Sequence, residues 1–399
     1  MESVKQKADR LTFACTLLAV TLPVISIAAS QIFLAAASLS FLFEKVARKK
    51  ADLYLPPIKA PLLAFIATTF MAFLFSPEPQ IGSPPLKKLV LFVIILLVVN
   101  KFSESRVIQA YHALFLTGSV AAGFSICQYL FLSRGNVGNR LTGFMGNWMT
   151  LSGEMMLVFT TLAAYLVFRN PVQKWLWSLS FCLVGIALAL TLTRSVWMAT
   201  LAGLTIILWL RHPHWKTLAL SALACMLLFL GAPKFLRDRA RSIFDMQDPS
   251  NYARSAIWRA GWRMVEAHPW TGVGPQRILK VFYDYHPCPN DRYRDGFFPV
   301  HMHNNLLQFA AERGVPCALA WLWLMLKLAR DHWGGFRQAK PGSETQAVQA
   351  IGFLSVIVLF LAGLFEFNFG DSEVLMIFLF LISAPYAVSR DASKGISSS

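Results

Sequence analysis

Two histidines and two asparagines stand together at residues 301–305, directly before a long apolar run. His303 and Asn304 fall where this run predicts the start of a helix, beside the partial positive charge of a helix N-terminus, which suits an anion. An imidazole with an ordinary pKa of about 6.5 accepts a proton at neutral pH, and positive neighbours help to keep it neutral. His303 is therefore a candidate general base, with His301 or Asn304 as neighbours that orient the ring or a substrate.

The same stretch allows two other interpretations. Asn304 could only cap the helix while the histidines form ordinary hydrogen bonds at a membrane interface. A zinc pair is the third option, but His301 and His303 would point the same way only on a strand, and no further ligand stands at a recognised spacing.

Three arginines are candidates for binding phosphate. Arg194, in TRSVWMA, stands between two apolar runs with no acidic residue within a helical turn in the sequence, which marks a functional candidate. Guanidinium groups bind phosphate oxygens through paired donors and stay ionised, so Arg194 suits a lipid-linked phosphate; the alternative is a side chain that extends to the lipid headgroups. Arg140, in a short glycine-rich loop, could add a phosphate contact or be an ordinary loop residue. Arg254, on a loop helix, would by itself be solvated.

The elements that must position these residues are membrane helices. Hydrophobic residues make up 56% of the chain and charged residues 15%, and the mean hydropathy is +0.51, whereas a soluble domain is about a quarter charged. We therefore expect an all-α polytopic membrane protein with about twelve transmembrane helices. The apolar runs lie at residues 11–28, 30–44, 58–76, 87–102, 107–132, 148–168, 175–193, 195–210, 217–233, 304–327, 347–366 and 372–389.

Lysines and arginines are abundant in the short loops on one side of the predicted membrane and rare in those on the other side. The positive-inside rule then puts the N- and C-termini in the cytoplasm and the segment before His303 on the outer side. The first apolar run lacks a small-residue cleavage site followed by a soluble domain, so we expect it to remain as a helix.

These spans predict four parts of the chain. Residues 1–233 would hold the first nine helices, 234–302 one large periplasmic loop, 303–389 the last three helices, and 390–399 a cytoplasmic tail. Within the loop we expect an amphipathic helix that is capped by Ser250 or Asn251 and stops near His268. The stretch 286–299 has no regular pattern.

The formal charge of +16 combines the cytoplasmic positive-inside signal with a basic patch in the large loop. Such a patch suits phosphate or acidic lipid, while nucleic acid is excluded as a partner because the charge is not gathered on a soluble recognition module. Four of the six cysteines fall in apolar spans, Cys317 lies in the helix after the histidines, and Cys288 stands alone in the loop. This arrangement offers neither a disulfide framework nor a thiolate zinc motif.

Together these pieces resemble the O-antigen ligase and polymerase superfamily, specifically between Arg194 and Gly314. The stretches that carry the resemblance are TRSVWMA, RSAIWRAGWRMVEAHPWTGVGP and HNNLLQFAAERG. The residues that match the family pattern are His303, Asn304, Leu307, Gln308, Glu312 and Gly314, and in the loop Arg254, Trp258, Gly272, Gly274 and Pro275. His301 is an additional histidine, so the choice of His303 as base follows the family's His-Asn step.

The resemblance implies a metal-independent, inverting glycosyltransferase of the GT-C type in the bacterial inner membrane, without a cofactor. Its donor would be a glycan on undecaprenyl diphosphate and its acceptor the lipid A–core oligosaccharide on the periplasmic side. Arg194 and Arg254 would stabilise the leaving diphosphate and His303 would act as the base. The substrate contacts that we expect come from Arg140, His301, Asn304, Trp258 and Gly274.

The same features are compatible with other functions. O-antigen polymerases and protein O-oligosaccharyltransferases share these motifs and the donor; the late position of the loop and the lack of a large soluble C-terminal domain favour the ligase. A transporter for the lipid-linked glycan would show charged or broken helices near the bilayer centre in repeated halves. Glu154 and Glu366 could be buried in the membrane, but the sequence contains no repeat.

Overall fold

The protein is all helical over the residues that the structure, a computed structural model, describes: 2–48, 53–132, 140–169, 171–245, 247–285 and 301–397. No strand occurs among them. The first ten α-helices are α1 (Glu2–Thr21), α2 (Ile27–Arg48), α3 (Lys59–Leu74), α4 (Ser83–Lys88), α5 (Val93–Lys101), α6 (Glu104–Cys127), α7 (Trp148–Arg169), α8 (Lys174–Leu190), α9 (Arg194–Arg211) and α10 (Trp215–Gly231). The others are α11 (Lys234–Arg241), α12 (Pro249–Ala267), α13 (Ile278–Tyr285), α14 (Asn305–Arg313), α15 (Val315–Gln338), α16 (Glu344–Ala362) and α17 (Ser372–Ser397).

Each predicted apolar run overlaps a helix or a group of helical segments. Among the described residues, six segments are long and apolar enough to cross a membrane: Ile27–Val46, Pro79–Lys101, Glu104–Phe131, Trp148–Arg169, Glu344–Ala362 and Ser372–Asp391. Shorter apolar helices are α3, α8 and α10. The chain is thus a helical, multi-pass membrane protein, while the count of about twelve spans stays a prediction.

Three helices form the centre of the bundle. The apolar windows of α7 and α17 are 89% and 83% buried, whereas that of α6 is only 33% buried. α16 packs against α7, α9, α15 and α17. Helices that are apolar on all sides take such central positions, and the helices around them keep an apolar outer face. The centre of the bundle therefore supports both α9 and the connection between α16 and α17.

The run predicted as one helix at residues 304–327 is two helices. α14 ends at Arg313, Gly314 follows with φ +87°, and α15 begins at Val315 with a proline in its first turn. A Cβ atom on Gly314 would lie 2.2 Å from the backbone oxygen of Trp270, so only glycine lets the two backbones approach this closely. His303 consequently precedes a nine-residue helix rather than a membrane-length one.

The amphipathic loop helix is present as α12, and its capping residue differs from the prediction. Asp248 caps it, since its carboxylate accepts the Ser250 N–H at 3.0 Å, and Pro249 occupies the first helical position. The prediction of Ser250 or Asn251 was wrong because Asn251 serves another contact, described below. The helix ends at Ala267, just before His268-Pro269 as predicted.

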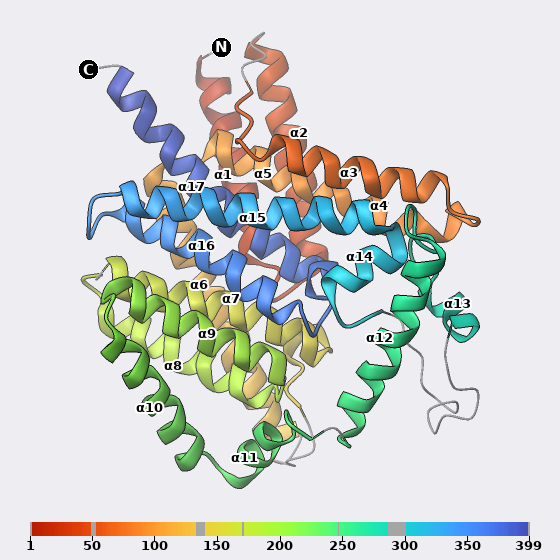
Figure 1. The fold of residues 1–399 in the computed structure, drawn as a ribbon. Coiled ribbons are helices and arrows are strands. Elements are labelled where there is room, and N and C mark those ends of the chain that lie inside the picture. Colours follow the sequence, from red (N-terminus) through yellow and green to blue (C-terminus); the bar gives the residue numbers. More distant parts are fainter. Residues whose placement is uncertain are drawn as a thin grey trace.

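A small second core holds the segments around α12 together. It consists of Ile257, Ala260, Met264, Val265, Val273, Ile278, Phe282, Met302 and Ala311, from α12, α13, α14 and the segments beside them. Burying a side chain such as Phe282 contributes about 2 kcal/mol. In Figure 1, α12 and α13 lie at the edge of the molecule, away from both termini. The predicted irregular stretch 286–299, with Cys288, lies outside the described residues.

Candidate active site

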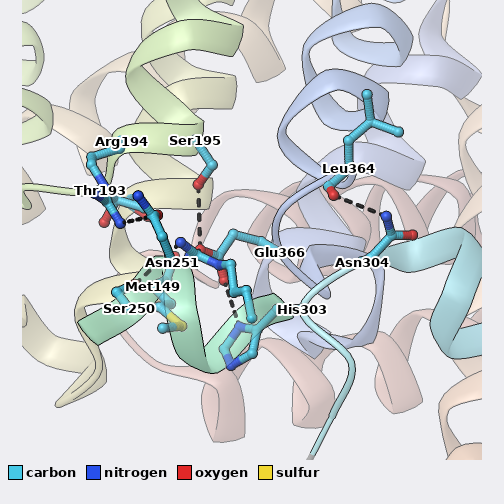
Figure 2. Close-up of polar contacts among 12 residues, drawn as sticks. Met149, Thr193, Arg194, Ser195, Ser250, Asn251, His303, Asn304, Leu364 and Glu366 are labelled. Carbon is cyan, nitrogen blue, oxygen red and sulfur yellow. Dashed lines mark hydrogen bonds and ion pairs between the residues drawn. The ribbon is translucent and has the colours of Figure 1, made fainter. Parts of the chain in front are cut away.

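Glu366 joins three distant parts of the chain. It follows α16, is 5% exposed, and its Oε1 accepts hydrogen bonds from Arg254 Nη2 at 2.6 Å and from Ser195 Oγ at 3.3 Å. Its Oε2 lies 3.2 Å from Nδ1 of His303 (Figure 2). One carboxylate therefore connects α9, α12 and the segment that leads into α14.

Two asparagines bring His303 to Glu366. Asn304 Nδ2 donates to the backbone oxygen of Leu364 at 2.9 Å, as Figure 2 shows, and the Asn305 N–H donates to Gly363 at 2.7 Å. The Asn304 Oδ1 atom accepts the Leu307 N–H and so caps α14. The capping interpretation of Asn304 is thus confirmed, and both polar atoms of its side chain are bonded within the protein.

The geometry leaves one nitrogen of His303 available for chemistry. A carboxylate accepts, so Nδ1 carries the proton that is shared with Glu366, and Nε2 holds a lone pair. No hydrogen bond to Nε2 occurs within the described residues, and the side chain is 21% exposed. An imidazole oriented in this way can accept a proton at Nε2 while the carboxylate stabilises the resulting cation.

Met302 fixes the backbone between the two histidines. Its side chain is fully buried in the second core, its N–H donates to Gln308 Oε1 at 2.7 Å, and its carbonyl accepts Trp258 Nε1–H at 2.9 Å. His303 follows with φ +48°, a conformation that costs a non-glycine residue energy and that clusters at functional sites. Trp258, predicted to contact substrate, here supports the backbone that carries the candidate base.

His301 also lies beside the candidate base. The ring centroids of His301 and His303 are 4.2 Å apart, and His301 Nδ1 accepts the His303 N–H at 3.4 Å. Burial, followed by the electrostatic effects of the neighbouring His303 and Arg254, lowers the pKa of His301 to about 4. His301 is therefore neutral at pH 7 and can keep Nδ1 as an acceptor.

Glu366 is ionised at neutral pH despite its burial. Burial alone would raise the pKa of this carboxyl group, but the hydrogen bond from His303 and the charge of Arg254 outweigh it, and the pKa lies below the ordinary value of 4.5. Removal of Glu366 would leave the guanidinium of Arg254 without its carboxylate.

Arg194 is buried and its terminal nitrogens are fully used. Nη1 donates to the carbonyl and the hydroxyl of Ser242 at 2.5 and 2.8 Å, and Nη2 donates to Asn251 Oδ1 at 2.7 Å and to Asp248 at 3.2 Å. The interpretation of Arg194 as a side chain extending to the headgroups is thus wrong, since its side chain is 5% exposed. Arg194 ties the start of α9 to the connection between α11 and α12.

Two further arginines share this electrostatic environment. Arg239, on α11, donates from Nε to Leu192 O at 3.2 Å; burial, followed by the charges of Arg140 and Arg194, lowers its pKa to about 10. Arg140 lies 5.0 Å from the ring of Trp148, and its pKa is lowered by burial and by the charge of Arg194. Both remain cationic at pH 7.

We call Arg140, Arg194, Arg239 and Arg254 the arginine cluster. Four guanidinium groups face the two carboxylates of Asp248 and Glu366, which leaves a net charge of +2 (4 − 2). Like charges gathered with too few counter-charges create a positive potential that attracts an anion.

The structure thus brings Arg140, Arg194, Arg254, His301, His303 and Asn304 into one neighbourhood. Gly274 is not part of it. With φ +103°, its N–H donates to Glu312 O at 3.1 Å, and a Cβ atom there would meet Ser76. The glycine therefore shapes the turn after α12, as the Gly-Pro pattern predicts.

Sequence reasoning missed Arg239, Asp248 and the role of Glu366 beside His303. Glu366 was noted only as a carboxylate that could be buried in the membrane. Its place at the end of an apolar run, opposite an arginine-rich loop, was the one available signal. Within the described residues, no three His, Cys, Asp or Glu side chains are grouped to hold a metal ion.

Fold and site together define a multi-pass membrane protein with a His–Glu–Arg site at the ends of its helices. The family model of the O-antigen ligases matches residues 179–322, and this segment contains Arg194, Arg254 and His303. The match confirms the resemblance to that superfamily over this segment, and the members of the family are glycosyltransferase-like enzymes, ligases and polymerases. No curated relative matches the sequence. Glu366 and Arg140 lie outside the matched segment.

Proposed function

We propose that this protein is an O-antigen ligase, which transfers a glycan from undecaprenyl diphosphate to the lipid A–core oligosaccharide at the periplasmic face of the inner membrane. The observation that carries the proposal is the His303–Glu366–Arg254 chain beside the arginine cluster. It puts a proton acceptor and an anion-binding surface in one site, as glycosyl transfer from a diphosphate requires.

In this reaction an acceptor hydroxyl attacks the anomeric carbon of the donor. The new carbon–oxygen bond forms as the bond to the diphosphate breaks, and the electron pair of that bond leaves with the diphosphate oxygen. His303 Nε2 takes the hydroxyl proton, and ionised Glu366 stabilises the imidazolium that results. A single displacement inverts the anomeric configuration.

The arginines meet the charge that develops on the leaving group. Arg140 and Arg239 are the best placed to contact it, because Arg254 is paired with Glu366 and the terminal nitrogens of Arg194 are bonded to protein acceptors. Arg239 has only a longer ion pair, 3.8 Å from Nη1 to Asp248 Oδ2. Arg194 then acts by holding α11 and α12 in position and by adding to the positive potential. Preorganised cations of this kind stabilise a developing anion without reorganising during the reaction.

The test is a reconstitution in vesicles with a defined glycan on undecaprenyl diphosphate. Two acceptors are compared, the lipid A–core oligosaccharide and a second lipid-linked glycan repeat, each with and without a chelator. We expect transfer to the core lipid only, of equal rate in chelator, with inverted configuration in the product. Elongation of the second repeat would instead make the protein a polymerase, and activity lost in chelator and restored by zinc would overturn the metal-independent mechanism.

A further inference from the structure

An open groove runs between α12 and the α14–α15 corner. Its lining residues are Ser255, Trp258, Arg259, Trp262, Arg263, Val265, Glu266, Asn304, Leu306, Leu307, Ala310, Val315 and Ala318. The groove has a volume of about 920 Å³, which is at the upper end of the about 300–1,000 Å³ of most small-molecule pockets. Its walls are mainly apolar, so its shape and surface suit long hydrocarbon chains.

The rim of the groove is basic. Arg259 and Arg263 are exposed on the outer face of α12, and neither forms an ion pair within the described part of the chain. Trp262, between them, is 60% exposed. Arginine beside tryptophan is typical of the level of lipid headgroups, where guanidinium groups bind phosphate and indoles lie at the interface.

The groove continues into an exposed apolar surface. Directly after Ala318 at its end, α15 presents Leu319, Trp323 and Leu326, which are 59%, 49% and 61% exposed. These residues follow the spacing of one helix face. A lipid could therefore lie with its head at the arginines of α12 and its chains in the groove and along α15.

The groove lies beside the residues that hold the candidate base. Asn304 and Trp258 line the groove. Asn304 follows His303 in the sequence, and Trp258 donates a hydrogen bond to the carbonyl of Met302, the residue before His303. In Figure 2, Arg194 and Asn304 lie on opposite sides of Glu366. A lipid in the groove would thus approach His303 from the side away from Arg194, which leaves the arginine cluster to the diphosphate donor.

We propose that this groove binds the acyl chains of a phosphorylated, multiply acylated lipid, whose phosphates are held by Arg259 and Arg263. In terms of the proposed function, this lipid is the acceptor. Only the acceptor role depends on that function, because binding of the lipid to the groove can be measured without any transfer.

The experiment compares lipid binding by the purified protein and by R259Q/R263Q, using native mass spectrometry in detergent. The probes are diphosphorylated hexa-acyl glucosamine disaccharide, its dephosphorylated form, undecaprenyl phosphate and phosphatidylglycerol. Because both substitutions are on an exposed helix face, the variant should fold. The matched control is R330Q/R337Q, which removes two exposed arginines at the other end of α15.

We expect R259Q/R263Q to weaken binding of the diphosphorylated disaccharide by about tenfold, the loss of roughly one charge-assisted phosphate contact. Binding of the dephosphorylated form and of undecaprenyl phosphate should stay within twofold, and the control should match the wild type. A second variant, A310F, fills the groove and should weaken both forms of the disaccharide.

Three results would overturn the proposal. Weakened binding of undecaprenyl phosphate alone would assign the groove to the donor chain. An equal loss for all anionic probes, including phosphatidylglycerol, would make the arginines a general headgroup contact, and no change for any probe would leave the groove without a ligand role. If the binding result is as expected but R259Q/R263Q leaves the acceptor KM unchanged in the transfer assay, the acceptor role fails while the lipid site stands.

Discussion

At the residue scale, the site depends on how two oxygen atoms of Glu366 are shared. One oxygen accepts from Arg254 and Ser195, and the other meets His303. The contact with His303 fixes which ring nitrogen carries the proton, since Nδ1 must donate and Nε2 is then free to accept. Glu366 is thus a positioning residue in the proposed reaction: it acts through His303 rather than on the substrate.

The first prediction concerns E366Q. We expect kcat to fall by about 10²-fold, because a neutral amide no longer stabilises the imidazolium and can present its NH₂ group to Nδ1, while the donor KM changes little. Steady-state transfer kinetics measure both constants. The matched variant S195A removes only a neutral hydrogen bond of 3.3 Å and should lose less than about tenfold. Equal losses in E366Q and S195A, or a loss confined to KM, would contradict the positioning role.

The second prediction concerns stability and pH. The pKa of His301 is about 4 in the folded protein, against an ordinary 6.5, because burial disfavours the charged ring. The folded state therefore binds fewer protons than the unfolded state between these values, and this contribution to stability is full above pH 6.5 and lost as the pH falls towards 4. Glu366 contributes in the same direction only below its ordinary 4.5.

The measurement is the thermal unfolding midpoint in detergent at pH 7.5, 6.0 and 5.0, for the wild type and H301N. The wild-type midpoint should fall more steeply between pH 6.0 and 5.0 than that of H301N. Parallel curves would show that His301 is not buried in its neutral form.

At the element scale, the break between α14 and α15 directs His303 towards the end of α16. The sequence predicts the apolar runs well because hydropathy is a local property, but it joins α14 and α15 into one run. That break depends on the approach of Trp270 to Gly314, which no local pattern encodes. The partners of His303 and Arg194 are also far away in the sequence. Glu366 lies 63 residues from His303, and Asp248 lies 54 residues from Arg194. The residue types of the site could be predicted, but the pairs could not.

The third prediction tests this break with G314A. The φ of +87° costs alanine about 1–2 kcal/mol, and the clash with the Trp270 oxygen adds to it. We expect a lower thermal midpoint and reduced transfer. G334A is the control within α15, where no neighbouring atom lies within 4 Å of the added Cβ; alanine there should be neutral or stabilising by up to about 1 kcal/mol. A midpoint for G314A at or above that of the wild type would show that the corner tolerates a side chain.

At the scale of the whole molecule, the termini and the site lie at different ends of the bundle (Figure 1). Near the termini, Arg106 pairs with Asp9, and the Glu104 N–H donates to Asp391, so the connection between α5 and α6 lies with both ends of the chain. The α11–α14 segments carry Arg239 and Arg254 of the arginine cluster and most of the lining of the groove. The positive-inside prediction assigns the first group to the cytoplasm and the second to the periplasm.

The fourth prediction follows from this division. In a background without the six native cysteines, S105C and R241C place single thiols at exposed positions of the two groups. A membrane-impermeant maleimide should label R241C in intact spheroplasts and S105C only after lysis, as quantified by gel shift. The opposite pattern would place the site in the cytoplasm and end the proposed reaction with a periplasmic acceptor.

The central claim is that His303 accepts the proton of the acceptor hydroxyl, while other residues bind the glycan donor. This claim is tested most directly with H303A. Donor binding and single-turnover transfer are measured on the same vesicles, with H268A as the control because His268 is exposed and bonded to Tyr285. We predict donor binding within twofold of the wild type and transfer slower by at least about 10²-fold in H303A, with H268A unchanged. Transfer by H303A at the wild-type rate would contradict the account.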